Sequence, residues 1–190
     1  MMQNKINFIA LAAGILSLVL IAVSMFVPWW QFTVSSPGNV QVNFSPVNFN
    51  FSHSGTSISI PLILALNIAC LLTLLAGALV LIIYAVKPAK PYSKHLLGFG
   101  YKKPLYTVIA FAAILIAVPL ILQVAVGINL PVNGSAIISP KGSSQSATAS
   151  AVLEWPFYFA IVVAGLSIAA RLYHRSLNKP IITNPAPYPQ

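Results

Sequence analysis

Few side chains in this chain could do chemistry. Its 190 residues include one acidic residue, Glu154, three histidines and one cysteine, Cys70. Hydrolysis and proton transfer generally need paired carboxylates, or a nucleophile beside a histidine. A zinc site needs several His, Cys or carboxylate ligands close together. The histidines stand apart in the sequence as His53, His95 and His174, and no phosphate-binding glycine loop occurs. We therefore expect no catalytic, metal or cofactor-binding residue, and a protein that is not an enzyme.

Three polar residues stand at regular spacing inside one apolar stretch. Asn67, Cys70 and Thr73 follow each other every third position and could form a polar seam with Gln123. Polar side chains at membrane depth either mark a pathway or form hydrogen bonds between helices. The second interpretation is favoured here, because none of these side chains is ionised. His95 and His174 could meet at the inner surface, although solvation at the membrane interface explains them more simply.

Four apolar stretches must position these side chains. They cover residues 8–27, 60–86, 105–128 and 155–172. A helix of about 20 residues crosses a hydrocarbon core of about 30 Å. The composition, 58% hydrophobic and 6% charged, excludes an ordinary soluble domain. The sequence predicts a mainly α membrane protein with one four-transmembrane-helix bundle. Small residues four apart, such as Ala10 and Gly14, are typical of close packing within such a bundle.

The basic residues predict the orientation. Nine of the ten lie at the N-terminus, in the inner loop 87–104, or at the end of the fourth span and in the tail 173–190. Basic residues near helix ends are retained in the cytoplasm. We expect a plasma-membrane protein with both termini cytoplasmic and outer loops at 28–59 and 129–154. The net charge of +9 then faces anionic lipid headgroups, and no nucleic-acid partner is needed. The nine residues are Lys5, Lys87, Lys90, Lys94, Lys102, Lys103, Arg171, Arg175 and Lys179.

Three Asn-x-Ser sequons agree with this orientation. They begin at Asn43, Asn50 and Asn133, all in the predicted outer loops. Such sequons are acceptors for N-glycosylation on exposed loops of exported segments. The alternative is that loops rich in Asn and Ser contain sequons by chance.

The first outer loop has the alternation of β-strands. Trp30, Phe32 and Val34 alternate with polar residues, and the pattern resumes after a turn at residues 36–39. Pro46 shifts the alternation, which predicts a bulge or strand end there. The second outer loop is a poorer candidate, because residues 143–150 are of low complexity. Within it, only residues 128–132 or 136–138 could add a strand. We expect a small extracellular antiparallel β-layer, formed by the first loop.

The apolar face of this layer has no evident cover in the sequence. Aromatic side chains bury large areas and commonly anchor interfaces. This face is therefore a candidate interaction surface, and packing of the loop onto the helix ends is an equally good alternative. The candidate residues are Trp29, Trp30, Phe32, Val42, Phe44, Phe49 and Phe51.

The predicted topology resembles the claudin-like tetraspan superfamily. The resemblance lies in four spans with both ends inside, a Trp-containing β-loop after the first span and a smaller second outer loop. Trp29 and Trp30 could stand for the first element of the family's loop signature. Its Gly-Leu-Trp triplet and two cysteines are missing. The resemblance implies outer loops that serve adhesion and lateral assembly.

These observations favour a structural or interaction protein of the cell envelope, either homo-oligomeric or bound to other membrane proteins. The alternative is an accessory subunit of a transporter or respiratory complex. Residues 28–153 contain no Asp or Glu. An outer surface without carboxylates keeps its charge in acid, as an acidophilic archaeon would need, although hydrophobic proteins often simply have few charges.

Overall fold

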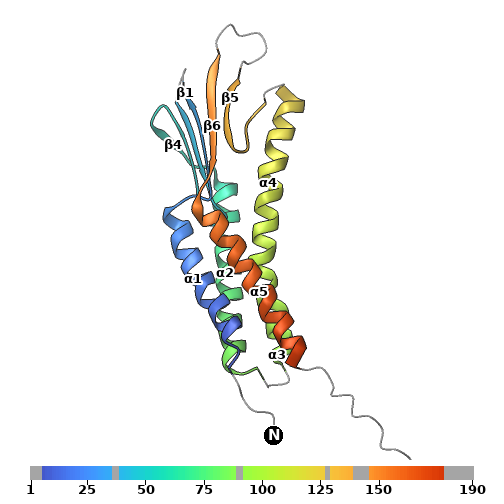
Figure 1. Ribbon diagram of the computed structural model, residues 1–190. Coiled ribbons are helices and arrows are strands. Elements are labelled where there is room, and N and C mark those ends of the chain that lie inside the picture. The colour runs from blue at the N-terminus through green and yellow to red at the C-terminus, as the bar shows by residue number, and fades with distance from the viewer. Residues whose placement is uncertain (1–5, 36–38, 89–91, 127–128, 139–145, 178–190) are drawn as a thin grey trace, which may run out of the picture.

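The computed structural model describes residues 6–35, 39–88, 92–126, 129–138 and 146–177. Helices lie side by side in a bundle, and a β-sheet stands at one end of it (Figure 1). In the described ranges, four helical stretches are long and apolar enough to cross a membrane. They contain α1 (Phe8–Phe26), α2 (Pro61–Val86), α4 (Lys102–Val126) and α5 (Trp155–Leu177). The predicted combination of long apolar helices with a small antiparallel sheet is confirmed, and it is compatible with a membrane helical bundle.

Small residues let the helices approach closely. A Cβ added at Gly14 of α1 would lie 2.6 Å from Cγ1 of Ile82 on α2. One added at Gly77 of α2 would lie 2.6 Å from Cβ of Lys103 on α4. Both distances are far shorter than a van der Waals contact, so only glycine fits. The predicted role of small residues in packing one bundle is confirmed at these two positions. At Gly165 the added Cβ would meet no atom within 4 Å.

The third apolar stretch differs from its prediction. Part of the predicted inner loop is helical, as α3 (Ser93–Gly100), and α4 begins at Lys102. The C-terminal part of α4 rises beside the sheet (Figure 1). An 18-residue apolar window of the combined stretch Ser93–Ala125 is only 12% buried, whereas those of the other three helices are 33–39% buried. This stretch is therefore the least covered by the rest of the chain.

The sheet has six antiparallel strands in the order β4-β3-β2-β1-β6-β5. The predicted strand end at Pro46 is confirmed, since β2 stops before it and β3 starts after it. Ser54 and Gly55 join β3 to β4 with φ of 50° and 80°, as a two-residue hairpin turn requires. Of the predicted turn at residues 36–39, residues 36–38 lie outside the described residues. The strands are β1 (Trp30–Ser35), β2 (Val40–Phe44), β3 (Phe49–His53), β4 (Thr56–Ile58), β5 (Gly134–Ile138) and β6 (Ala147–Leu153).

The expectation that the predicted second outer loop is a poor candidate for strands is wrong for β6. Residues 148–153 of this strand pair with the whole of β1, from Trp30 opposite Leu153 to Ser35 opposite Thr148. Its alanines alternate with Thr148, Ser150 and Val152, so their methyl groups share one face. Pairing with a neighbouring strand outweighs the weak β-propensity of Ala and Ser. The predicted strand at residues 136–138 is confirmed as part of β5.

Candidate interaction surface

The register gathers the large apolar side chains of the sheet on one face. Trp30 stands opposite Phe44, and Phe32 stands opposite Val42. On the next pair of strands, Phe44 lies opposite Phe49 and Val42 opposite Phe51. Directly opposed residues share a face of an antiparallel sheet. The predicted apolar face therefore exists as one continuous surface across β1, β2 and β3.

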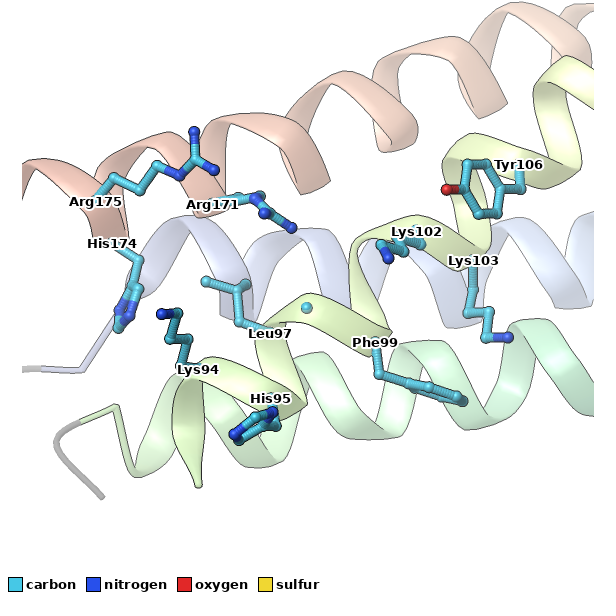
Figure 2. Close-up of a pocket in the computed structure, with 11 residues that line it drawn as sticks. Lys94, His95, Leu97, Phe99, Lys102, Lys103, Tyr106, Arg171, His174 and Arg175 are labelled. Atoms are coloured by element: carbon cyan, nitrogen blue, oxygen red, sulfur yellow. The ribbon is translucent and has the colours of Figure 1, made fainter. Parts of the chain in front are cut away.

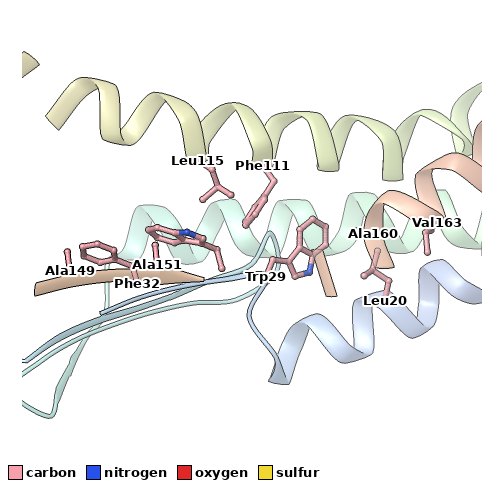
Figure 3. Packing of buried hydrophobic residues seen from close by; sticks show 10 residues of the cluster. Leu20, Trp29, Phe32, Phe111, Leu115, Ala149, Ala151, Ala160 and Val163 are labelled. Carbon is pink, nitrogen blue, oxygen red and sulfur yellow. The ribbon is translucent and has the colours of Figure 1, made fainter. Parts of the chain in front are cut away.

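Helix α4 covers the middle of this face. Phe111 and Leu115 belong to the same buried cluster as Trp30, Phe32, Ala149 and Ala151. Figure 3 shows Leu115 above the strands that carry Phe32 and the two alanines. Neither alanine has any exposed surface. Their small side chains leave room for the rings of β1 and for the helix above them.

The segment after α4 also helps to cover the sheet. The indole N–H of Trp30 donates to the carbonyl oxygen of Val132 at 2.8 Å. Leu130 and Val132 pack against the same buried cluster. A buried indole needs a partner for its N–H, and this contact supplies one. Residues 130–132 are thereby fixed over β1.

Trp29 lies where helices and sheet meet. It is 1% exposed, and its ring centroid is 5.0 Å from that of Phe111 and 6.2 Å from that of Phe157. Its indole N–H donates to Oγ of Ser24 at 2.7 Å. The N–H of Glu154 donates to the Trp29 carbonyl at 2.9 Å. Trp29 therefore joins the end of α1 to the start of α5.

Three of the seven predicted interface residues are therefore corrected. Trp29, Trp30 and Phe32 are buried within the chain itself, so they offer no surface to a partner. The alternative, packing of the loop onto the helices, holds for them. The other four residues are half-buried at the rim of the covered area and stay a prediction: Val42, Phe44, Phe49 and Phe51. The error arose because the sequence does not show that the third apolar stretch extends over the sheet.

The turn between β2 and β3 caps the end of α1. Ser45 is fully buried, and its hydroxyl donates to the Ser24 carbonyl at 2.9 Å. The side-chain amide of Asn48 donates to the Met25 carbonyl at 2.8 Å. The last carbonyls of a helix have no partner within the helix. The turn supplies these partners and so fixes the sheet to α1.

Asn67 of α2 holds the same turn. With its amide oriented to satisfy both neighbours, its nitrogen donates to the Pro46 carbonyl at 3.3 Å and its oxygen accepts from the Phe49 N–H at 3.0 Å. Gln123 is exposed on α4. Neither the possible polar seam with Gln123 nor the favoured hydrogen bonding between helices describes Asn67, because its partners are backbone groups of the sheet turn. Sequence reasoning missed the turn as a partner.

The sequons lie on the polar face or at the edge of the sheet. Asn43 stands directly opposite Asn50, on the face away from α4. The first sequon's serine is the buried Ser45 described above. Asn133 is exposed and leads into edge strand β5 through Gly134, whose φ is +93°. The three sequons therefore differ in how accessible they are on the folded protein.

The surfaces that the chain leaves open lie elsewhere. On the C-terminal part of α4, Ile121 is 63% exposed and Val124 is 88% exposed. Ile137, on edge strand β5, is 76% exposed. β4 and β5 end the sheet, and each presents backbone groups on its outer side. Apolar side chains on α4 and two strand edges are thus available for contacts with other molecules.

At the opposite end of the bundle, a polar chain joins three helices. The Asn7 side-chain amide donates to the Tyr84 hydroxyl at 3.1 Å, and that hydroxyl lies 2.8 Å from Nδ1 of His174. His95 lines the same pocket as His174. Among the described residues, no three His, Cys, Asp or Glu side chains group closely enough to hold a metal ion.

Comparison with known proteins assigns no family to the chain. Function is therefore inferred from the geometry of the sheet, its junction with the helices and the exposed surfaces. No protein-family model matches the chain, and no curated protein matches it.

Proposed function

We propose that this protein is a non-enzymatic membrane scaffold that carries an outer β-sheet and associates laterally with a second copy through the outer half of α4. The contact between Phe111 and Trp29 is the observation that carries the proposal. Trp29 follows the end of α1, so α4 from residue 112 to Val126 extends past that end. This extension is about 22 Å long at 1.5 Å per residue.

The extension favours a protein contact over a lipid contact. The 19 residues of α1 span about 28 Å, close to the thickness of a hydrocarbon core. A bilayer aligned with α1 would leave Ile121 and Val124 outside it. The exposed Gln123 on the same segment suits an aqueous position. Apolar side chains exposed to water commonly mark a site of association.

A second copy of the chain suits this surface. The six strands and residues 112–126 contain no Asp, Glu, Lys or Arg. Two such surfaces approach each other without charge repulsion, and surfaces near zero charge tend to associate. The half-buried rim residues Phe44 and Phe49 would extend the contact. The resemblance to claudin-like tetraspan proteins supports the same role through topology alone.

The proposed orientation places the sheet outside the plasma membrane and both chain termini in the cytoplasm. The distribution of basic residues supports it. The same exposed flank of α4 would also fit a larger membrane protein. An accessory subunit of a transporter or respiratory complex is therefore the second candidate function.

Cross-linking in native membranes tests the proposal. Val124→Cys, in a Cys70→Ala background, should give a disulfide or bismaleimide-linked species of twice the chain's mass. Ile137→Cys is the matched control, because Ile137 is also strongly exposed but lies on the face of the sheet away from α4. Equal cross-linking at the two positions, or none at Val124→Cys, would contradict self-association through α4. A Val124→Cys product that contains another protein would replace it with the accessory role.

A further inference from the structure

The end of the bundle away from the sheet contains an open pocket of about 490 Å³. α3, the start of α4 and the last turns of α5 form its walls (Figure 2). Half of the chain's ten Lys and Arg side chains are among the described residues that line it. They are Lys94, Lys102, Lys103, Arg171 and Arg175.

The pocket has no acidic side chain to balance these charges. The only Asp or Glu in the sequence is Glu154. It precedes α5, whereas Arg171 lies 17 positions further along, or about 25 Å of helix. That distance exceeds the screening length of about 8 Å at physiological ionic strength. The cations in the pocket therefore repel one another without compensation from a carboxylate of a side chain.

Two of the cations are held in place by aromatic rings. Nζ of Lys103 lies 4.4 Å from the centroid of the Phe99 ring. Cζ of Arg171 lies 4.3 Å from the centroid of the Tyr101 ring. Such contacts stabilise a cation without neutralising it. The rings thus keep positive charge at the pocket where free side chains would move apart.

The cations also come from opposite walls. Arg171 and Arg175 are four residues apart on α5, so they share one face of that helix. Lys94 comes from α3 and Lys102 from the start of α4. Figure 2 shows the arginines above the pocket and Lys94 below it. The charged residues therefore line a common space, from α5 on one side and from α3 and α4 on the other.

We propose that this pocket binds a phosphate-bearing anion. A phosphate monoester carries about −1.5 to −2 charges at neutral pH and offers several acceptor oxygens. One guanidinium group can donate hydrogen bonds to two such oxygens at once, and a lysine adds a compact positive charge. The phosphate belongs either to a lipid headgroup of the adjacent leaflet or to a small soluble compound. Bound phosphate would hold α3 against α5 and relieve the repulsion between them.

The full-length protein in phosphatidylcholine nanodiscs provides the test. One arm adds phosphatidic acid to the nanodisc, and the other adds inorganic pyrophosphate to the buffer. The thermal midpoint should rise in at least one arm, because a ligand that binds the folded state stabilises it. A rise in the first arm alone identifies a lipid headgroup, and a rise with pyrophosphate identifies a soluble compound. No rise in either arm would overturn the proposal.

Variants distinguish binding at the pocket from a general attraction of anions to basic residues. Arg171→Gln with Arg175→Gln should weaken binding of the active probe roughly tenfold or more. Arg175→Gln as a single substitution should also weaken binding. Lys87→Gln should not, since Lys87 is exposed as well but does not line the pocket. Lys94→Gln with Lys102→Gln repeats the test on two exposed side chains. Equal losses from Lys87→Gln and Arg175→Gln would show diffuse attraction and contradict a defined site.

Discussion

The ring of Phe111, in the middle of α4, lies edge-on to the indole of Trp29, with centroids 5.0 Å apart and planes at 63°. The same phenyl ring is 5.0 Å from Phe44 of β2 and 5.8 Å from Phe157 of α5. One side chain therefore touches the end of α1, the sheet and the start of α5. It marks the level at which the bundle ends and the sheet begins.

Phe111→Ala should lower the free energy of unfolding by about 3–5 kcal/mol, since a buried ring is lost and a cavity is left. The thermal midpoint of the purified protein checks this. Ile109→Ala, two residues away on the same helix, is the control, because Ile109 is 55% exposed. Similar midpoints for the two variants would show that Phe111 does not join the helices to the sheet.

Ala151→Leu should destabilise the protein by about 1–3 kcal/mol, because the larger side chain must displace Phe32 or α4. Ala151 has no exposed surface and stands opposite Phe32. Val152→Leu adds one methylene group to the next residue, which points to the other face and is 46% exposed. The midpoint of Val152→Leu should match that of the unchanged protein. A stable Ala151→Leu protein would contradict close packing between α4 and β6.

The sequence predicts the helices well because apolar length is a local property. It also predicts β1, β2 and β3, where large apolar residues such as Phe32 and Phe44 alternate with polar ones. The sequence does not predict β6, because alanine and serine have a low β-propensity. The strand is stabilised by its pairing with β1. The burial of Trp29 could not be predicted either, because it also depends on a partner distant in the sequence. It depends on Phe111, which lies 82 positions later in the chain.

Ser45→Ala should cost about 1–3 kcal/mol, because the buried Ser24 carbonyl and Asn48 N–H lose a hydrogen-bond partner. Hydrogen exchange should also become faster in the turn between β2 and β3. Ser57→Ala is the control, since Ser57 is exposed on edge strand β4. An unchanged exchange rate at Asn48 would argue against the turn as the cap of α1.

The folded protein should accept a glycan at Asn133 more readily than at Asn43. Asn133 is exposed, whereas Asn43 stands opposite Asn50 and its sequon hydroxyl is buried in Ser45. Incubation with an oligosaccharyltransferase, followed by intact-mass measurement, checks this. The Asn133→Gln variant should lose more of the added mass than Asn43→Gln. The reverse order would contradict the exposure of these residues in the folded sheet.

Labelling of intact cells tests the central claim, that α4 extends beyond the membrane on the side of the sheet. Cysteine replaces Gln123, Ser146 or Ser176 in a Cys70→Ala background, and a membrane-impermeant maleimide is added outside. All three side chains are exposed in the structure. The account predicts labelling at positions 123 and 146, and at position 176 only after the cells are opened. An unreactive Gln123→Cys, together with a reactive Ser146→Cys, would place the end of α4 in the bilayer and contradict it.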